Sequence, residues 1–374
     1  MPPPLFGEIR IVDLFSGVGG FAVGAAMAAE ALGFLPRLVA AVDVDTDALE
    51  VHRRNLGTER TVAANMREVV RFAIRGPDDA AAFEERPVVV SQPLARLSAP
   101  DVVIAGPPCE GHSNLNNTSR RDDPRNGLIL CAASFAVAVG ARALVVENVR
   151  QIIHDRRGNF ASTMALLRNS GWAVEQAILN AADFGAPQSR ERIFLVAFRD
   201  GGHIDVFRDF VARVKTGPLT VGDALEDLLE CDRRDAFDTP PTPTPENRRR
   251  IDHLFERGLH DLPCDMRPPC HRNGTSYKAV YGRLWWDRPA PTVTTGFGTP
   301  GRGRFIHPLR PRLVTPHEAA RLQTFPDWFD FRDERGCCPP RKSLEKWIGD
   351  AVPPVLGFAV VLATLAALDN RVCR

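Results

Sequence analysis

The first half of the chain alternates short apolar runs with helical patterns, and this alternation constrains the fold more than any other feature. Helical patterns cover residues 20–32, 46–56 and about 128–139. Strands alternating with helices are typical of a doubly wound, mostly parallel sheet, so we predict an α/β fold. The apolar runs that indicate strands are residues 9–15, 37–43, 101–105, 143–149, 173–179 and 192–198.

The pattern changes after Asp200. A proline-rich stretch at 239–245 precedes a basic region of weak periodicity at 248–286. Helical pattern returns at 315–325, where Thr315 and Glu318 match a capping box, and again from about Pro353 to Leu368. We therefore predict three parts. These are a larger domain over 1–200, a smaller irregular domain over 201–312, and a C-terminal segment over 313–374 that returns to the larger domain.

Composition is that of a soluble globular protein, with 44% hydrophobic and 25% charged residues and a net charge of +1. This balance neither requires nor excludes nucleic acid as a partner. The start of the chain lacks a basic, apolar signal peptide. The apolar run at 351–368 contains two prolines and a glycine, which favours a core helix over a membrane span. The eight cysteines show no disulfide framework, so we expect free thiols in a reducing cytoplasm.

Cys109 lies in the stretch GPPCEGHS, directly after the apolar strand pattern of 101–105. A core cysteine would lie among aliphatic residues, whereas this one follows two prolines that end the strand. Ligands of open α/β sheets bind at the carboxyl ends of the strands. We therefore predict that Cys109 lies at the mouth of the sheet.

A glycine-rich turn, DLFSGVGGFAVG, follows the first strand pattern, and Asp43 ends the second. In nucleotide-binding sheets such a turn approaches the ligand closely and such an acid takes the ribose hydroxyls. The glycine spacing is not that of a pyrophosphate-binding turn. NAD and S-adenosylmethionine both carry a suitable ribose, and a tight turn without any ligand is the alternative.

Two further motifs follow strand patterns at the same predicted edge. Glu147 in the sequence ENV comes directly after an apolar run, which favours a cleft where it can carry a proton over a solvated surface position. Arg190 and Arg192 in QSRER are spaced to share one face of an entering strand. Paired surface arginines are the alternative explanation.

Cys264, Cys270 and His271 raise the possibility of a zinc site, with Cys337 and Cys338 elsewhere. Their spacings match no standard zinc finger, so we expect structural or incidental thiols and no metal.

Taken in order, these motifs resemble the cytosine-C5 DNA methyltransferase family over most of the chain. The resemblance continues in RPAPTVTTG (288–296), LVTPHEAARLQTFPDWF (313–329) and IGDAVPP (348–354). It implies an S-adenosylmethionine-dependent, Rossmann-like catalytic domain with a smaller target-recognition domain. The Pro-Cys and Glu-Asn-Val motifs are its most specific part, far more so than the glycines.

The resemblance implies catalytic roles for Cys109, Glu147, Arg190 and Arg192. Cys109 would attack C6 of a flipped cytosine, which makes C5 able to take a methyl group. Glu147 would hold N3 and the exocyclic amine, and Arg192 would reach O2. Three residues depart from the family pattern, namely Glu110, His112 and Asp350, and they put fine geometry in doubt rather than the reaction class.

The resemblance also implies a cofactor site. Phe15 would pack on the adenine, Gly17 and Gly19 would line the methionine end, Asp43 would take the ribose, and Asn65 could reach the adenine amine. Asp350 would pair with the amino group. The full expected set is Phe15, Ser16, Gly17, Gly19, Gly20, Asp43, Val44, Asn65, Pro108, Leu128, Asp350 and Ala351.

DNA would be contacted by the loop after Cys109 and by the smaller domain. Arginine and glycine suit phosphates, while Arg, Asn and Tyr can read base edges. The expected DNA-binding residues are Ser113, Arg120, Arg121, Arg125, Arg248, Arg249, Arg250, Arg267, Arg272, Asn273, Tyr277, Thr292, Arg302 and Arg304. A plain solvated loop is the alternative for the region after Cys109.

The sequence thus predicts a monomeric, cytoplasmic, nucleoid-associated enzyme acting on double-stranded DNA, with a cognate restriction endonuclease as a functional partner or none. A tRNA-methylating relative is one rival, but the Cys-Phe-Thr element that marks that branch is missing. A catalytically inactive DNA-binding homologue is disfavoured by intact Cys109, Glu147 and Arg192. A nicotinamide dehydrogenase would not need the Pro-Cys and Glu-Asn-Val motifs.

Overall fold

The computed structural model describes residues 7–109, 123–199, 204–230, 235–269 and 279–368. The chain divides into two compact units. Unit 1 comprises residues 1–180, 191–215 and 354–374, and unit 2 comprises residues 181–190 and 216–353. The expected domain boundaries at 200 and 312 therefore differ from these units, because residues 313–353 group with unit 2 and only the last helix returns to unit 1.

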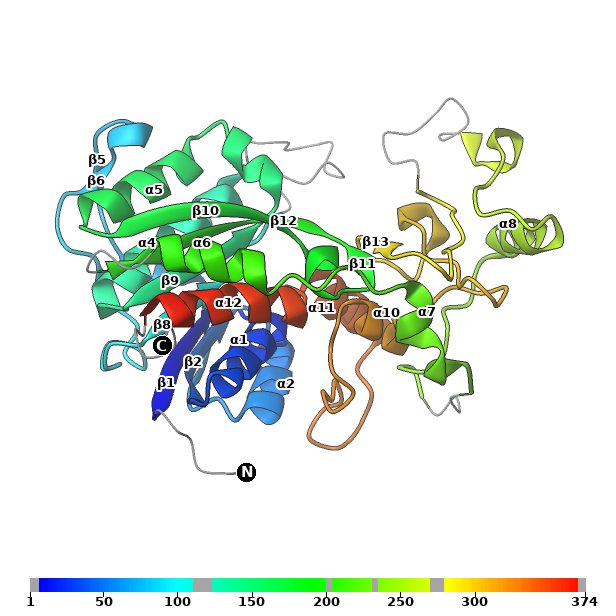
Figure 1. Ribbon diagram of the computed structural model, residues 1–374, viewed down its shortest axis with the longest axis horizontal. Helices are drawn as coiled ribbons and strands as arrows, with labels where there is room; N and C mark the ends of the chain where they lie inside the picture. Colours follow the sequence, from blue (N-terminus) through cyan, green and yellow to red (C-terminus); the bar gives the residue numbers. More distant parts are fainter. Residues whose placement is uncertain (1–6, 110–122, 200–203, 231–234, 270–278, 369–374) are drawn as a thin grey trace. The chain divides into compact units, whose positions relative to one another are not determined.

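Within the described residues, unit 1 is built on a seven-stranded sheet (Figure 1). Its strand order is β10-β12-β9-β8-β1-β2-β3, and the pairings from β9 through β3 are parallel. β12 runs antiparallel to both β9 and β10, so the predicted mostly parallel α/β sheet is confirmed. The strands are β1 (Glu8–Leu14), β2 (Leu35–Asp43), β3 (Thr61–Ala63), β8 (Val102–Ala105), β9 (Ala143–Asn148), β10 (Ala173–Asn180) and β12 (Glu191–Phe198).

Helices cover both faces of this sheet, because alternate strand residues point to opposite sides. α1 (Gly20–Ala31), α6 (Ile204–Arg213) and α12 (Pro354–Leu368) pack together on one face, where Phe21 meets Phe194. α4 (Leu128–Val139) and α5 (Asn159–Asn169) share the core on the other face. The remaining helices of unit 1 are α2 (Thr46–Leu56) and α3 (Met66–Val69), with 3-10 turns η1 (Asp78–Ala80), η2 (Pro124–Gly127) and η3 (Arg150–His154).

The apolar C-terminal helix α12 is a core helix, as predicted. Most of its residues are buried, and it packs on α1 and α6. Gly24 allows this contact, since a Cβ at that position would lie 2.2 Å from the carbonyl oxygen of Pro354. A larger side chain there would push α1 and α12 apart.

Small hairpin strands that the sequence did not predict lie between β3 and β8. β4 (Val70–Arg71) pairs with β7 (Val88–Val89), and β5 (Ile74–Arg75) pairs with β6 (Ala82–Phe83). They are too short for a period-two apolar pattern to be seen in the sequence.

Unit 2 contains mostly short elements. The basic region, which we predicted to be irregular, begins instead with a regular helix, α8 (Pro245–Glu256), because Thr244 caps this helix and Pro245 occupies its first turn. The capping box of Thr315 and Glu318 is confirmed at the start of α10. The elements of unit 2 are η4 (Ala181–Phe184), β11 (Gln188–Ser189), α7 (Val221–Leu225), η6 (Asp227–Glu230), α8 (Pro245–Glu256), η7 (Cys264–Met266), β13 (Ala290–Pro291), η8 (Pro300–Arg302), α10 (Pro316–Leu322) and α11 (Arg341–Asp350).

Candidate active site

Cys109 follows the carboxyl end of β8, as the sequence predicts. It is half-buried, and the neighbouring strand β9 ends in Glu147 and Asn148. Asn148 donates from Nδ2 to the carbonyl oxygen of Pro107 at 3.1 Å and accepts from the backbone N–H of Val149 at 2.9 Å. The buried amide of Asn148 therefore ties the cysteine loop to the glutamate strand.

Glu147 and Arg192 form an ion pair at the same edge of the sheet. Arg192 Nε lies 2.8 Å from Glu147 Oε1, and the side chains are only 13% and 10% exposed. The two charged groups are close enough to attract each other, but their geometry is not that of a hydrogen bond. The buried Oε1 of Glu147 therefore has no hydrogen-bond donor among the described residues. Such an oxygen can accept a hydrogen bond from the amine of an incoming base. A buried acceptor without a donor costs free energy, which this hydrogen bond would recover.

Arg190 does not share this arrangement, which corrects the prediction that it acts beside Arg192. It precedes β12, belongs to unit 2 and is 3% exposed. Its guanidinium donates to the carbonyl oxygens of Val293 at 2.8 Å and Gly349 at 3.2 Å. Arg190 thus organises the interior of unit 2. The preceding Gln188 does the same, since it accepts from the N–H of Val293 and donates to the carbonyl of Leu322.

The glycine-rich turn after β1 has an unusual backbone. Phe15, Gly17 and Gly19 have φ of 56°, 49° and 99°, in the region that favours glycine. A non-glycine residue such as Phe15 persists there only when its surroundings hold it, and such strain is common at ligand sites. The turn leads into α1, whose first residue is Gly20.

Asp43 joins this turn at the end of β2. Its carboxylate accepts from the N–H of Gly17 at 2.8 Å and from the N–H of Asp45 at 2.9 Å. Each oxygen retains a lone pair that a ribose hydroxyl can use. The adjacent Val44 is 70% exposed, so an apolar surface stands ready beside the acid.

The other expected cofactor residues differ in their surroundings. Ser16 and Leu128 are buried, while Pro108 is half-buried. Asn65 is exposed after β3 and caps α3 by accepting from the N–H of Arg67 at 3.1 Å. Asp350 and Ala351 belong to unit 2, where Asp350 pairs with Lys346 at 3.0 Å.

Several of the predicted DNA-contacting arginines are engaged within the protein. In unit 2, Arg304 is 5% exposed, donates to the carbonyls of His260 and Arg283, pairs with Asp261 and lies 3.9 Å from the ring centroid of Trp285. We therefore correct its assignment, since a buried guanidinium with these partners is not available to a phosphate. In unit 1, Arg125 forms a bidentate ion pair with Asp123, donating from Nε at 3.0 Å and from Nη2 at 2.8 Å.

Helix α8 shows a clear division among its arginines. Arg248 donates to the carbonyl of Pro311, and Arg250 donates to Asn247 and to the carbonyl of Met266. Arg249 is 75% exposed, with Glu246 at 3.9 Å. Arg249 is therefore the α8 side chain best presented to a ligand.

The remaining expected DNA contacts fall into two groups. Arg267 donates to the carbonyl of Leu262, Thr292 donates to the carbonyl of Ser189, and Arg302 is exposed. Six other positions lie outside the described residues, namely Ser113, Arg120, Arg121, Arg272, Asn273 and Tyr277.

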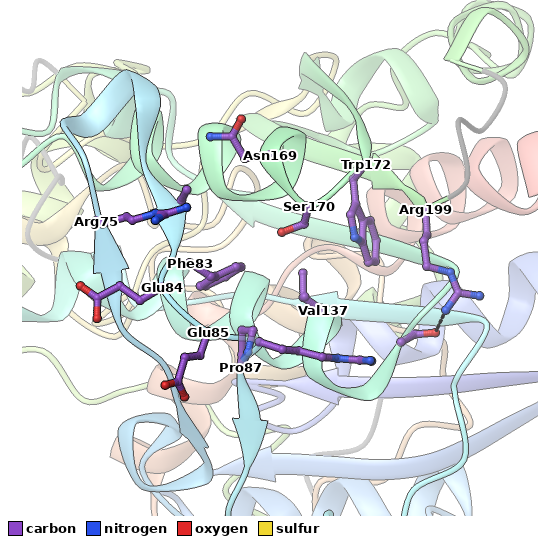
Figure 2. Close-up of a pocket in the computed structure, with 13 residues that line it drawn as sticks. Arg75, Phe83, Glu84, Glu85, Pro87, Val137, Asn169, Ser170, Trp172 and Arg199 are labelled. Carbon is purple, nitrogen blue, oxygen red and sulfur yellow. Dashed lines mark hydrogen bonds between the residues drawn. The ribbon is translucent and has the colours of Figure 1, made fainter.

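A cavity of about 620 Å³ in unit 1 lies away from Cys109, Glu147 and Asp43 (Figure 2). Its lining includes Val137, Gly140, Trp172 and Arg199. Gly140 and Trp172 precede β9 and β10, and Arg199 follows the antiparallel β12, so the cavity lies at the amino edge of the sheet. Arg199 is held there by donating to the carbonyl of Gly140 at 2.7 Å. None of the expected cofactor residues lines it.

Sequence reasoning missed two side chains of unit 1. Asn148 lies in the ENV motif beside Glu147, and that position is the sequence signal for its role in tying the strand to the cysteine loop. His52, on α2, gave no signal in the sequence because its partner Asp13 is distant in the chain.

One edge of the doubly wound sheet carries a half-buried cysteine, a glutamate–arginine pair and a glycine-rich turn with positive φ angles, which are groups that an α/β group-transfer enzyme needs. The comparison with known families makes this specific. A family model for C-5 cytosine-specific DNA methylases matches residues 9–365. The chain therefore belongs to that family and is a methyltransferase.

Curated relatives and solved structures agree with this. The chain is 39% identical to the Type II methyltransferase M1.BsuMI of Bacillus subtilis, covering 96% of this chain and 81% of that protein. It is 29% identical to M.XorII of Xanthomonas oryzae over 96% of this chain and 85% of that protein. The structure of S. pombe Dnmt2 methyltransferase matches with a TM-score of 0.57 at 16% identity, covering 96% of this chain and 98% of that chain, which shows the shared fold.

Proposed function

We propose that the protein transfers a methyl group from S-adenosylmethionine to C5 of a flipped cytosine in double-stranded DNA, through a covalent bond between Cys109 and C6. The observation that carries this proposal is the pairing of Arg192 with Glu147 next to the loop of Cys109, tied together by Asn148. This is the arrangement that holds the edge of a pyrimidine while a thiolate adds to its ring.

The proposed steps use the residues of unit 1. The Cys109 thiolate adds to C6, and the displaced electron pair makes C5 nucleophilic while a proton from Glu147 reaches N3. Glu147 Oε1 would accept a hydrogen bond from the exocyclic amine, and Arg192 would donate to O2. After C5 has taken the methyl group, a base removes the C5 proton, the bond to Cys109 breaks and the N3 proton returns to Glu147. This restores the thiolate, the Glu147 carboxylic acid and the aromatic ring.

The residues around the glycine turn fit S-adenosylmethionine. The free lone pairs of Asp43 suit the ribose hydroxyls, and the exposed Val44 with Phe15 offers apolar surface for the adenine. When bound, the cofactor supplies the electrophilic methyl sulfonium. S-adenosylmethionine has no pyrophosphate, which agrees with a glycine spacing that differs from that of pyrophosphate-binding turns.

We also infer a Type II modification enzyme, because relatives of this name cover most of the chain. DNA is the proposed partner, contacted in part by Arg249, Arg267 and Arg302 of unit 2. A cognate restriction endonuclease would be a functional rather than a physical partner. The protein would work as a monomer in the compartment that holds the DNA.

Labelled-methyl transfer tests this proposal. The full chain should transfer label from S-adenosylmethionine to duplex DNA and not to tRNA, and bisulfite sequencing of DNA from expressing cells should locate the methylated site. Cys109→Ser should abolish transfer while cofactor binding remains. DNA carrying 5-fluorocytosine should trap a covalent adduct at Cys109, since fluorine cannot leave as a proton does. An adduct on another cysteine would overturn the mechanism, and label in tRNA alone would favour the tRNA-methylating rival.

A further inference from the structure

A buried chain of polar contacts lies beneath the glycine-rich turn. Asp13, near the end of β1, is 1% exposed, and its Oδ2 lies 3.2 Å from Nε2 of His52. His52, on α2, is fully buried, and its Nδ1 lies 2.9 Å from Oγ1 of Thr58. Both ring nitrogens therefore have partners, and the contacts join β1, α2 and the residue that follows the C-cap of α2.

The His52 ring supports the turn directly. A Cβ on Gly19 would lie 2.7 Å from His52 Cδ2 and 2.8 Å from Leu56 Cδ1, so the backbone of Gly19 rests against these α2 side chains. Gly19 also accepts the first contact of α1, because the N–H of Val23 donates to its carbonyl at 2.8 Å. The height of α2 under the turn thus sets where Gly19 and the start of α1 lie.

The turn is held on its other side by Asp43. That carboxylate accepts a hydrogen bond from the N–H of Gly17. Burial raises the pKa of Asp13 above its ordinary value, and the nearby charge of Asp43 adds a smaller effect in the same direction. The hydrogen bond from His52 acts in the opposite direction and lowers the pKa of Asp13. His52 is therefore the group that makes a buried carboxylate tolerable directly behind the ribose-binding acid.

We propose that Asp13, His52 and Thr58 are positioning residues for the cofactor. Their contacts hold the turn from Phe15 to Gly19 in the position at which this turn and Asp43 together bind S-adenosylmethionine. In this proposal the three side chains do not touch the cofactor but act on it through Gly19. The inference rests on the proposed function, because it takes this turn as the S-adenosylmethionine site.

The test is calorimetric binding of S-adenosylmethionine to the whole 374-residue chain, with thermal unfolding and DNA binding measured on the same samples. The variants are His52→Ala, His52→Gln and Thr58→Val. Gln keeps a donor for Asp13 but removes the ring under Gly19, and Val keeps the shape of Thr58 but not its hydroxyl. Leu49→Ala is the matched control, since Leu49 is a buried residue of the same helix with its side chain in the core.

The expected result is a Kd raised at least tenfold in His52→Ala, less in His52→Gln and least in Thr58→Val, with DNA affinity unchanged. Leu49→Ala should lower Tm but leave the cofactor Kd near that of wild type. If Leu49→Ala and His52→Ala raise the Kd equally at equal loss of Tm, His52 only stabilises the fold and the inference is wrong. An unchanged Kd in His52→Ala and Thr58→Val would also overturn it. Failure of the wild-type chain to bind S-adenosylmethionine would instead overturn the proposed function.

Discussion

Arg192 lies diagonally across the β9–β12 pairing from Glu147, with 2.8 Å between Nε and Oε1. Phe194 is the residue directly opposite Glu147 in this antiparallel register, and Arg192 is on the same face of β12 as Phe194. The edge of the sheet therefore presents a carboxylate and a guanidinium together. Neither strand alone could place both groups against one face of a base.

This pair leads to a first prediction on catalysis. Glu147→Gln keeps the size of the side chain but removes its proton transfer and the charge that Arg192 faces. We expect methyl transfer to fall about 10²–10⁴-fold, the usual contribution of general acid–base catalysis. Single-turnover rates with labelled cofactor would measure it. Glu191→Gln is the control, since Glu191 is exposed and pairs with Arg150 at 3.3 Å. Near wild-type rates in Glu147→Gln, or an equal loss of rate in both variants, would contradict the assignment.

A second prediction concerns the acid behind the glycine turn. Asp43→Ala should weaken S-adenosylmethionine binding by about 1.5–3 kcal/mol, because hydrogen bonds to charged groups have this magnitude. Calorimetric titration of the cofactor would measure the change. Asp45→Ala is a matched control, since Asp45 caps α2 by accepting from Ala48 N–H, so it should lower Tm without the same loss of affinity.

A third prediction separates the arginines of unit 2. Arg249→Ala should weaken DNA binding and reduce the salt dependence of log K by about 0.9 for one lost phosphate contact, with Tm unchanged. Arg304→Ala should instead destabilise the protein by roughly 2–4 kcal/mol, because it leaves buried carbonyls without their donor. Fluorescence anisotropy over a salt series and chemical denaturation would distinguish the two. The reverse pattern would show that the exposed arginine is not a DNA contact.

A fourth prediction concerns stability against pH. His307 is fully buried, its Nδ1 accepts from the N–H groups of Leu309 and Arg310, and Nε2 lies 3.5 Å from Glu318 Oε1. Burial lowers the pKa of His307 to about 4, and Arg312, Arg310 and Arg283 act in the same direction while Glu318 opposes them. The folded state thus keeps this ring neutral where the unfolded chain, near 6.5, already binds a proton.

The sign follows from that difference. Above pH 6.5 both states are neutral and His307 has no effect, but as the pH falls towards 4 the unfolded state gains a proton that the folded state does not. His307 should therefore cost roughly 3 kcal/mol of stability across this window. His307→Asn retains an acceptor for the two N–H groups and should flatten the pH dependence of unfolding. His154→Asn, at an exposed position, should leave it as in wild type.

Much of unit 1 could be predicted from the sequence because its signals are local. The helix at 46–56 is observed with the predicted bounds, since Asp45 caps its start and Gly57 ends it at φ 61°. The buried strands read as continuous apolar runs because helices cover both faces of the sheet. Cys109 follows one such strand after two prolines, and Glu147 lies at the end of another, so their place at the carboxyl edge was predictable.

What only the tertiary structure decided are relations between distant residues. Arg190 and Arg192 look equivalent in sequence, yet one is buried in unit 2 on the carbonyls of Val293 and Gly349 while the other pairs with Glu147. Arg304 reads as a DNA contact until its buried partners are seen. A charged residue is free or engaged according to which side chains and carbonyls the fold brings within about 3 Å of it. That is a property of packing between segments far apart in the chain, which local pattern and charge cannot encode.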